Sequence, residues 1–70
     1  MVRWHLLFEE APPKFIKRVD GEKWSSTKEL LLEGGDIVFG SYTEDRQGNR
    51  GWTYHGGVVI AWREKVNNYE

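Results

Sequence analysis

The clearest pattern of apolar and polar positions lies between residues 34 and 63, where apolar and aromatic runs are cut by glycines. The runs occupy residues 36–43, 52–55 and 58–62. Short runs rich in β-branched and aromatic residues, with glycine at their ends, are typical of antiparallel strands joined by local turns. Apolar residues fall on both parities of the first run, as Ile37 and Phe39 alternate with Val38. The pattern therefore predicts a strand there without fixing its inward face.

The N-terminal part of the chain predicts a first strand and then a hairpin. Val2, Trp4, Leu6 and Phe8 alternate with Arg3, His5, Leu7 and Glu9, a period of two that indicates a half-buried strand. Pro12-Pro13 ends it because proline has no amide proton to donate. Residues 14–19 form a second strand candidate. Asp20-Gly21 follows and predicts a two-residue type I′ turn, which requires positive φ at both positions.

The hairpin prediction fixes a register. With Asp20-Gly21 as the turn, residues 22–24 form the return strand. Lys17 then lies opposite Trp24, and Arg18 lies opposite Lys23, a like-charge pair that is mildly unfavourable.

Residues 27–33 predict a short helix. Ser26 and Glu29 have the spacing of a capping box, three leucines follow, and Gly34 offers the residue just after the helix end. Such a helix has about two turns and needs tertiary packing to persist. The alternative is an extended segment leading into a turn.

The remaining connections are predicted as loops. The polar, glycine-bearing stretch after Thr43, residues 44–51, predicts an exposed hairpin loop. Gly56-Gly57 predicts a tight turn before the last strand, and residues 67–70 predict a frayed tail.

Together these elements predict one small α+β, β-rich domain over residues 1–70. Its strands, four to five in number, would form an antiparallel sheet or a partly closed SH3-like barrel, with one short helix near residues 27–33. The expected core consists of apolar and aromatic residues from every element: Trp4, Leu6, Phe8, Phe15, Leu31, Ile37, Phe39, Val59 and Trp62.

A set of short motifs over residues 29–70 resembles the SH3 domain. The motifs are Glu29-Leu30, Gly35-Asp36-Ile37-Val38, Gly51-Trp52, Gly57-Val58-Val59 and Asn68-Tyr69. The resemblance implies a small barrel or strongly bent sheet. The positions that build the family's groove for proline-rich peptides differ, since Thr53 follows Gly51-Trp52 and no proline precedes Asn68-Tyr69. The resemblance therefore implies a fold, not proline-motif binding.

Composition narrows the class of protein. The 70 residues include ten aromatic residues, four of them Trp, and no Cys, so neither a disulfide nor a thiolate zinc site can form. No segment resembles a targeting signal or a membrane span, and we expect a cytoplasmic protein without a membrane partner. The net charge is −1, but residues 14–28 hold five Lys and Arg against two acids, whereas residues 29–49 hold one Arg against five acids. The two ends of the domain should therefore differ in electrostatic potential, with residues 14–28 the more positive.

Residues that could carry catalysis are scattered. His5 and Glu9 are four apart on a predicted strand, a spacing that does not converge on one metal. His55 stands beside a turn without further ligands nearby in the sequence, and the glycine pairs lack the context of a phosphate-binding loop. We therefore expect no enzyme, no cofactor and no metal site.

Basic residues interleaved with aromatic residues are the strongest binding signal. Such surfaces hold single-stranded nucleic acid through phosphate contacts and base stacking. On the predicted hairpin, Phe15 and Trp24 are surrounded by four cations: Lys14, Lys17, Arg18 and Lys23. The candidate binding residues are Lys14, Lys17, Arg18, Trp24, Arg46, Arg50, Trp52 and Tyr54. The alternative is that the tryptophans form the core and the cations protect a sheet edge.

These observations predict a non-catalytic binding protein. A protein partner ranks first, because Trp, Tyr and Arg dominate interface hot spots and a small sheet leaves edges open to a partner's strand or to a second copy. An inhibitor or accessory factor of a phage or mobile element fits that size. The alternative is binding of single-stranded nucleic acid through the 14–24 hairpin and the 46–54 loop.

Overall fold

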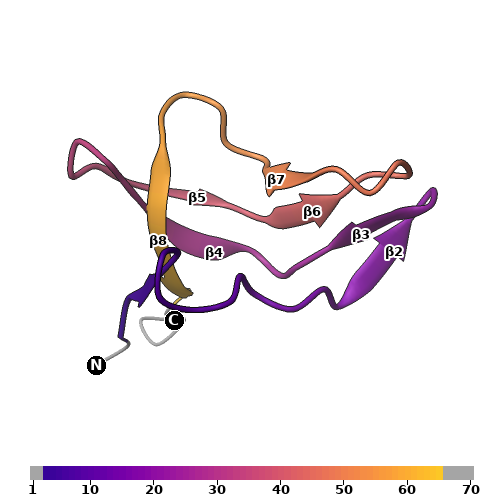
Figure 1. The fold of residues 1–70 in the computed structure, drawn as a ribbon, viewed down its shortest axis with the longest axis horizontal. Helices are drawn as coiled ribbons and strands as arrows, with labels where there is room; N and C mark the ends of the chain where they lie inside the picture. Colours follow the sequence, from indigo (N-terminus) through magenta and orange to yellow (C-terminus); the bar gives the residue numbers. More distant parts are fainter. Residues whose placement is uncertain (1–2, 66–70) are drawn as a thin grey trace, which may run out of the picture.

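The computed structural model describes residues 3–65, which contain eight short antiparallel strands and no helix (Figure 1). The strands are β1 His5–Leu6, β2 Lys17–Val19, β3 Glu22–Trp24, β4 Lys28–Leu32, β5 Ile37–Gly40, β6 Tyr42–Glu44, β7 Arg50–Trp52 and β8 Val59–Glu64. The prediction of a β-rich fold is confirmed, with more and shorter strands than expected.

The strands form two four-stranded sheets, in the orders β1-β8-β4-β5 (the first sheet) and β2-β3-β6-β7 (the second sheet). One long ribbon runs through both, because β3 leads into β4 and β5 leads into β6, and these segments pair with each other along the ribbon (Figure 1). The Cα radius of gyration is 12.2 Å, against about 11 Å for a compact domain of this length. The slight excess agrees with sheets arranged end to end.

The ribbon passes from one sheet to the other at a joint made by three hydroxyl residues. Ser25, 1% exposed, accepts a hydrogen bond from the Tyr42 amide through Oγ (2.9 Å), and its own amide donates to the Tyr42 carbonyl (2.8 Å). On the other side, Thr53 Oγ1 accepts from the Ser41 amide (3.0 Å) and the Thr53 amide donates to the Ser41 carbonyl (2.9 Å). Side chains thus replace ladder bonds where the ribbon bends.

Close approach of the backbone at the joint requires a glycine. A Cβ on Gly40 would lie 2.9 Å from both Leu30 Cδ1 and Thr53 Oγ1. Only glycine leaves room there for the fully buried Leu30 and for the Thr53 hydroxyl, which accepts the hydrogen bond from the Ser41 amide.

The hydrophobic core belongs to the first sheet. Its buried apolar residues come from the two central strands, β4 and β8: Leu30, Leu32, Ala61 and Trp62. The β4–β8 register places Leu30 against Trp62 and Leu31 against Ala61, and it shifts between Leu31 and Leu32. A central strand is paired on both edges, so its backbone is satisfied while its side chains are buried.

The predicted helix over residues 27–33 is wrong, because these residues form strand β4 and the turn after it. As a helix of two turns the segment would have little stability of its own. As a strand it pairs with both β5 and β8 and buries Leu30 and Leu32 on one face. Gly34 ends no helix; the turn places Gly35 at φ +98° instead.

Part of the predicted core is also wrong. Phe8, Ile37 and Phe39 are 79%, 51% and 56% exposed, whereas Trp62 is buried as expected. Phe8 lies in a turn after the two-residue β1, and Ile37 and Phe39 lie on edge strand β5. Trp4, Leu6, Phe15, Leu31 and Val59 are half-buried.

The β2–β3 hairpin confirms the sequence prediction closely. Asp20 and Gly21 have φ of 51° and 84°, the positive values that a type I′ turn requires. Lys17 pairs with Trp24 and Arg18 with Lys23. The other boundaries are corrected: the first strand is limited to His5–Leu6 and the second to Lys17–Val19.

Strand pairing within residues 3–65 does not close the sheets into a barrel. The edge strands β1 and β5 of the first sheet, and β2 and β7 of the second, each pair with a single neighbour. Gly56-Gly57 lies in the connection from β7 to β8, which crosses between sheets and does not form a two-residue hairpin. The Asn68-Tyr69 motif and the predicted tail at residues 67–70 lie outside the described residues.

The described part of the chain has no helix with the length and apolar character needed to cross a membrane.

The joint yields a first prediction, for the substitution Ser25→Ala. It leaves the amide of half-buried Tyr42 without its side-chain acceptor, which costs about 1–3 kcal/mol of unfolding free energy. Urea unfolding followed by circular dichroism measures the change. Ser26→Ala is the control, because the Ser26 hydroxyl makes no hydrogen bond within residues 3–65 and the substitution should change stability by less than about 0.5 kcal/mol. Equal losses in the two variants would contradict the role of Ser25.

Candidate functional site

One face of the second sheet carries a row of charged residues. The registers align Arg18, Lys23, Glu44 and Arg50 across the four strands. Because side chains alternate between the faces of a sheet, all four project to the same side. Three cations therefore flank one carboxylate on this face.

The carboxylate of this row is held by the cations beside it. Glu44 Oε1 accepts a hydrogen bond from Arg50 Nε at 2.6 Å, and Glu44 Oε2 lies 3.6 Å from Lys23 Nζ. These contacts, the Arg50 bond above all, hold the pKa of Glu44 below its usual value. The side chain of Glu44 is 16% exposed, while those of Lys23 and Arg50 are 41% and 56% exposed. The solvent thus meets the cations more than the carboxylate.

Aromatic rings continue this face beside the charged row. Tyr42 and Trp52 are cross-strand partners whose ring centres lie 4.8 Å apart. Phe15, from the segment before β2, stacks on Tyr42 at 5.7 Å with an interplanar angle of 8°. The Arg50 guanidinium lies 5.7 Å from the centre of the Phe15 ring. Cations and rings thus alternate within one surface.

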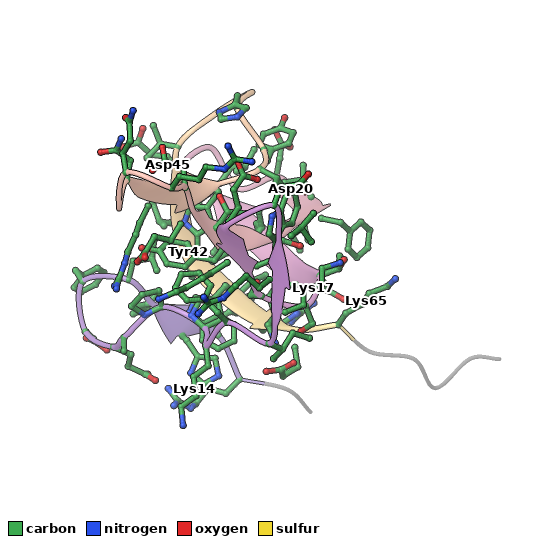
Figure 2. All side chains as sticks on the ribbon, turned by 90° about the vertical axis from the view of Figure 1, so that its right-hand side faces the viewer. Lys14, Lys17, Asp20, Tyr42, Asp45 and Lys65 are labelled. Atoms are coloured by element: carbon green, nitrogen blue, oxygen red, sulfur yellow. The ribbon has the colours of Figure 1, made fainter. Side chains whose placement is uncertain are left out.

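An open groove of about 680 Å³ runs along this face, between the sheet and residues 11–16. We call it the basic groove. Its charged lining residues are all cations: Lys14, Lys17, Arg18, Lys23 and Arg50. Phe15 and Tyr42 supply its rings. In Figure 2, which views the molecule from the end where the hairpin tips lie, Lys14 and Tyr42 lie to one side of β2 and Lys17 to the other.

The structure brings together half of the residues that the sequence singled out. Lys14, Lys17, Arg18 and Arg50 all line the basic groove. Lys17 contributes least, because its ammonium lies on the opposite face of the sheet, 5.8 Å from the centre of the Trp24 ring. Lys14 and Arg18 are exposed and form no ion pair within residues 3–65.

Trp24 and Trp52 line a second, smaller hollow of about 430 Å³ together with Arg50 and His55. Trp24 faces away from the basic groove, because it shares its face with Lys17 and Thr43 in the strand registers. Its buried indole nitrogen has no hydrogen-bond partner within the described residues.

The other two predicted residues have structural roles. Arg46 lies across Gly21 and donates through Nε to the Asp20 carbonyl, which fastens the two hairpin tips together. Tyr54 is half-buried, and its ring covers Gly56, where an added Cβ would collide with the Tyr54 hydroxyl. Neither residue lines the basic groove.

Tyr42 is the groove residue that sequence reasoning missed. The alternation through residues 36–43 predicts one strand, which places Tyr42 with Val38. The break at Ser41 assigns Tyr42 to the second sheet instead. In the sequence, the sign of that break is the presence of the hydroxyl residues Ser25, Ser41 and Thr53, which form the joint between the sheets.

The tip of the β6–β7 hairpin is held in shape by Asp45. Its Oδ1 accepts hydrogen bonds from the amides of Gln47 and Asn49, both at 2.9 Å, and its Oδ2 accepts one from Asn49 Nδ2 at 3.2 Å. These bonds, that from the Asn49 amide first, lower the pKa of Asp45. Because the tip is ordered by its own side chains, it fixes the position from which β7 presents Arg50 and Trp52.

A second cluster of polar residues lies on the first sheet. The His5 ring stacks on Trp62 with ring centres 4.3 Å apart, and Lys28, 7% exposed, lies 5.4 Å from the Trp62 ring and bonds Glu64 at 2.8 Å. His55 is exposed in the loop after β7. Within residues 3–65 no three His, Asp or Glu side chains gather closely enough to hold a metal ion.

This chain matches no protein-family model, no curated protein and no solved structure. What it binds has to be inferred from the contacts and charges described above. Of the two hollows on the second sheet, the basic groove is lined by the greater number of cations and also by the half-buried rings of Phe15 and Tyr42.

The contacts of Glu10, in the turn after β1, predict how stability changes at low pH. Glu10 accepts a hydrogen bond from Arg3 Nη1 at 2.6 Å and lies 2.8 Å from His5 Nδ1, and these contacts lower its pKa from 4.5 to about 2. A carboxylate whose pKa is lowered by folding stabilises the folded state above its unfolded pKa. This contribution is lost as the pH falls from about 4.5 to about 2.

Carbon-13 NMR of the Glu10 carboxyl measures this directly. We expect a titration midpoint near pH 2 in the native chain. In Arg3→Ala the midpoint should rise toward 4.5, because the first cause of the shift is removed. A native midpoint near 4.5 would show that the contact does not persist in solution.

Proposed function

We propose that this chain is a non-catalytic binding protein that holds single-stranded nucleic acid in the basic groove. The observation that carries the proposal is the alignment of cations beside stacked rings on one face of the second sheet. Phosphates would contact Lys14, Arg18 and Lys23, and bases would lie against Phe15 and Tyr42. Proteins that bind single strands with little sequence preference combine these two features.

Electrostatics supports this assignment despite the net charge of −1. At physiological ionic strength charges are screened beyond about 8 Å, so a bound strand senses the local surface and not the whole molecule. Locally the lining charges are positive, and the Glu44 carboxylate is largely covered by its two cationic partners. The acids that balance the overall charge lie elsewhere in the chain.

The rings favour a nucleic acid over an acidic peptide at this site. An acidic peptide would satisfy the cations, but its side chains offer no flat surface for Phe15 and Tyr42. Every nucleobase has such a surface, and stacking on an aromatic side chain contributes about 1–3 kcal/mol per base. The sequence ranked a protein partner first; for this face, the spatial arrangement favours the alternative.

The salt dependence of binding tests the phosphate contacts. We expect an oligothymidylate of about 12 nucleotides, within the range of small single-strand sites, to bind with a log–log salt slope of about −2, from three phosphate contacts at about 0.7 each. Arg18→Ala should weaken binding and make the slope shallower by about 0.7. Isothermal titration calorimetry between about 0.05 and 0.2 M salt measures both.

The matched control is Lys65→Ala. It removes one positive charge just after β8, away from the basic groove, and should leave affinity and slope unchanged. Equal effects of Arg18→Ala and Lys65→Ala would indicate attraction to net charge alone. Polyglutamate of equal charge is then tested as a competitor of the bound oligothymidylate. If it displaces the strand as effectively as free oligothymidylate does, the groove binds acidic proteins and the proposal is overturned.

Stacking is tested by Phe15→Leu. The variant keeps an apolar side chain of similar length but removes the ring, so affinity should fall at least about fivefold, corresponding to about 1 kcal/mol. The salt slope should not change, because no phosphate contact is lost. Phe8→Leu, at an exposed phenylalanine that does not line the groove, is the control and should bind as the native chain does. An unchanged affinity in Phe15→Leu, with native thermal stability, would contradict stacking.

A further inference from the structure

The first sheet has an open edge, where the Lys65 ammonium lies 5.6 Å from the centre of the Phe39 ring. Strand β5 pairs with β4 alone among the described residues. It contains no charged residue and no proline, and its outward side chains, Ile37 and Phe39, are 51% and 56% exposed. Natural edge strands are usually protected by a Lys, a proline or a bulge, because an open edge can pair with another strand.

The backbone of this edge offers hydrogen bonds at alternate residues. The Leu32 amide donates to the Asp36 carbonyl at 2.8 Å, so the polar backbone groups of Asp36 point toward β4. In an antiparallel pair these groups alternate in direction along the strand. Those of Val38 therefore also point toward β4, whereas those of Ile37 and Phe39 point away to the open side.

We propose that this edge binds the same edge of a second copy of the chain, by antiparallel pairing of β5 about a two-fold axis at Val38. In that register Ile37 of each copy lies opposite Phe39 of the other. Both residues turn their backbone groups to the open side, so the two pairs form four hydrogen bonds. A register shifted by one residue would pair outward-facing with inward-facing groups and lose these bonds.

The side chains of this register are also self-complementary. Ile37 and Phe39 lie on the outer face of the sheet, and pairing an aromatic with a β-branched residue across strands is favourable by roughly 0.2–1 kcal/mol. Within each copy the row through Ile37 continues to Leu31 and Ala61, and the row through Phe39 continues to Glu29 and Arg63. In the dimer, the apolar row of one copy, Ala61, Leu31 and Ile37, continues into Phe39 of the other copy. It ends at that copy's Glu29–Arg63 ion pair (2.8 Å).

The size of the contact sets its strength. A strand of four residues buries less than the roughly 1,200 Å² of a standard stable interface. The dimer is therefore weak and depends on protein concentration, with monomers prevailing in dilute solution. A heterologous contact would extend into fibres, whereas this two-fold contact uses both edges and closes.

Sedimentation velocity over a concentration series tests the dimer. The native chain should shift from monomer to dimer as concentration rises. Phe39→Lys should raise the dissociation constant at least about tenfold, because a lysine on an edge strand blocks pairing. Phe8→Lys makes the same exchange at a residue that is 79% exposed in a turn, and should dimerise as the native chain does. Circular dichroism verifies that both variants are folded.

Disulfide formation tests the register separately. The chain has no Cys, so Val38→Cys introduces a unique thiol. At the two-fold axis the Cα atoms of this position in the two copies would lie about 4.5 Å apart, within the range that a disulfide spans. Under mild oxidation this variant should form a covalent dimer at least about tenfold faster than Ile37→Cys, whose equivalent positions are diagonal and about 8 Å apart.

Three results would overturn the proposal. The first is a native chain that remains monomeric at every concentration, which would leave the edge to a strand of another protein. The second is an equal loss of dimer in Phe39→Lys and Phe8→Lys. The third is equal rates of disulfide formation in Val38→Cys and Ile37→Cys.

Discussion

The fold depends on the hydroxyl groups that let one ribbon belong to two sheets. Where the ribbon bends, Ser25 and Thr53 supply the acceptors that a straight ladder would have supplied. Without them the amides of Ser41 and Tyr42 would lose these partners at the point where the sheets meet. A chain of 70 residues cannot build two separate cores, so sharing both ribbon strands is what makes two sheets possible in so small a protein.

The two sheets differ in what they bury. The first sheet holds the buried apolar residues of β4 and β8. The second sheet leaves its cations and half-buried rings at the surface, arranged by short hairpins whose tips are fastened by Arg46 and Asp45. The positive charge that is concentrated in residues 14–24 of the sequence is also concentrated in space, because these residues all lie on or beside the second sheet.

Local signals in the sequence predicted local structure well. Asp20-Gly21 fixed a hairpin and its register, because both turn residues and both strands lie within eight residues. The same reasoning failed for residues 27–33, because what makes them a strand is pairing with β8, about thirty residues away, and no local pattern encodes that partner. The capping-box spacing at Ser26 is present but has no helix to cap, because the residues after it form strand β4.

The basic groove could be predicted only in part for a related reason. The cations of the hairpin are close in sequence and were identified together. Tyr42 was not, since a continuous alternation hides a change of sheet at Ser41. Likewise the exposed edge at Ile37 and Phe39 was predicted as core, because burial depends on where a strand lies in the sheet order, which composition does not reveal.

The distribution of tryptophans gives each sheet its own optical probe. Trp62, pressed between the His5 ring and the Lys28 ammonium, senses the interior of the first sheet, and Trp52 against Tyr42 senses the rim of the second. Their indoles sit in unlike surroundings, so intrinsic fluorescence separates events at one end of the molecule from events at the other. Emission followed during unfolding, in variants that keep one of the four tryptophans, then shows whether the two halves of the ribbon melt together or one after the other.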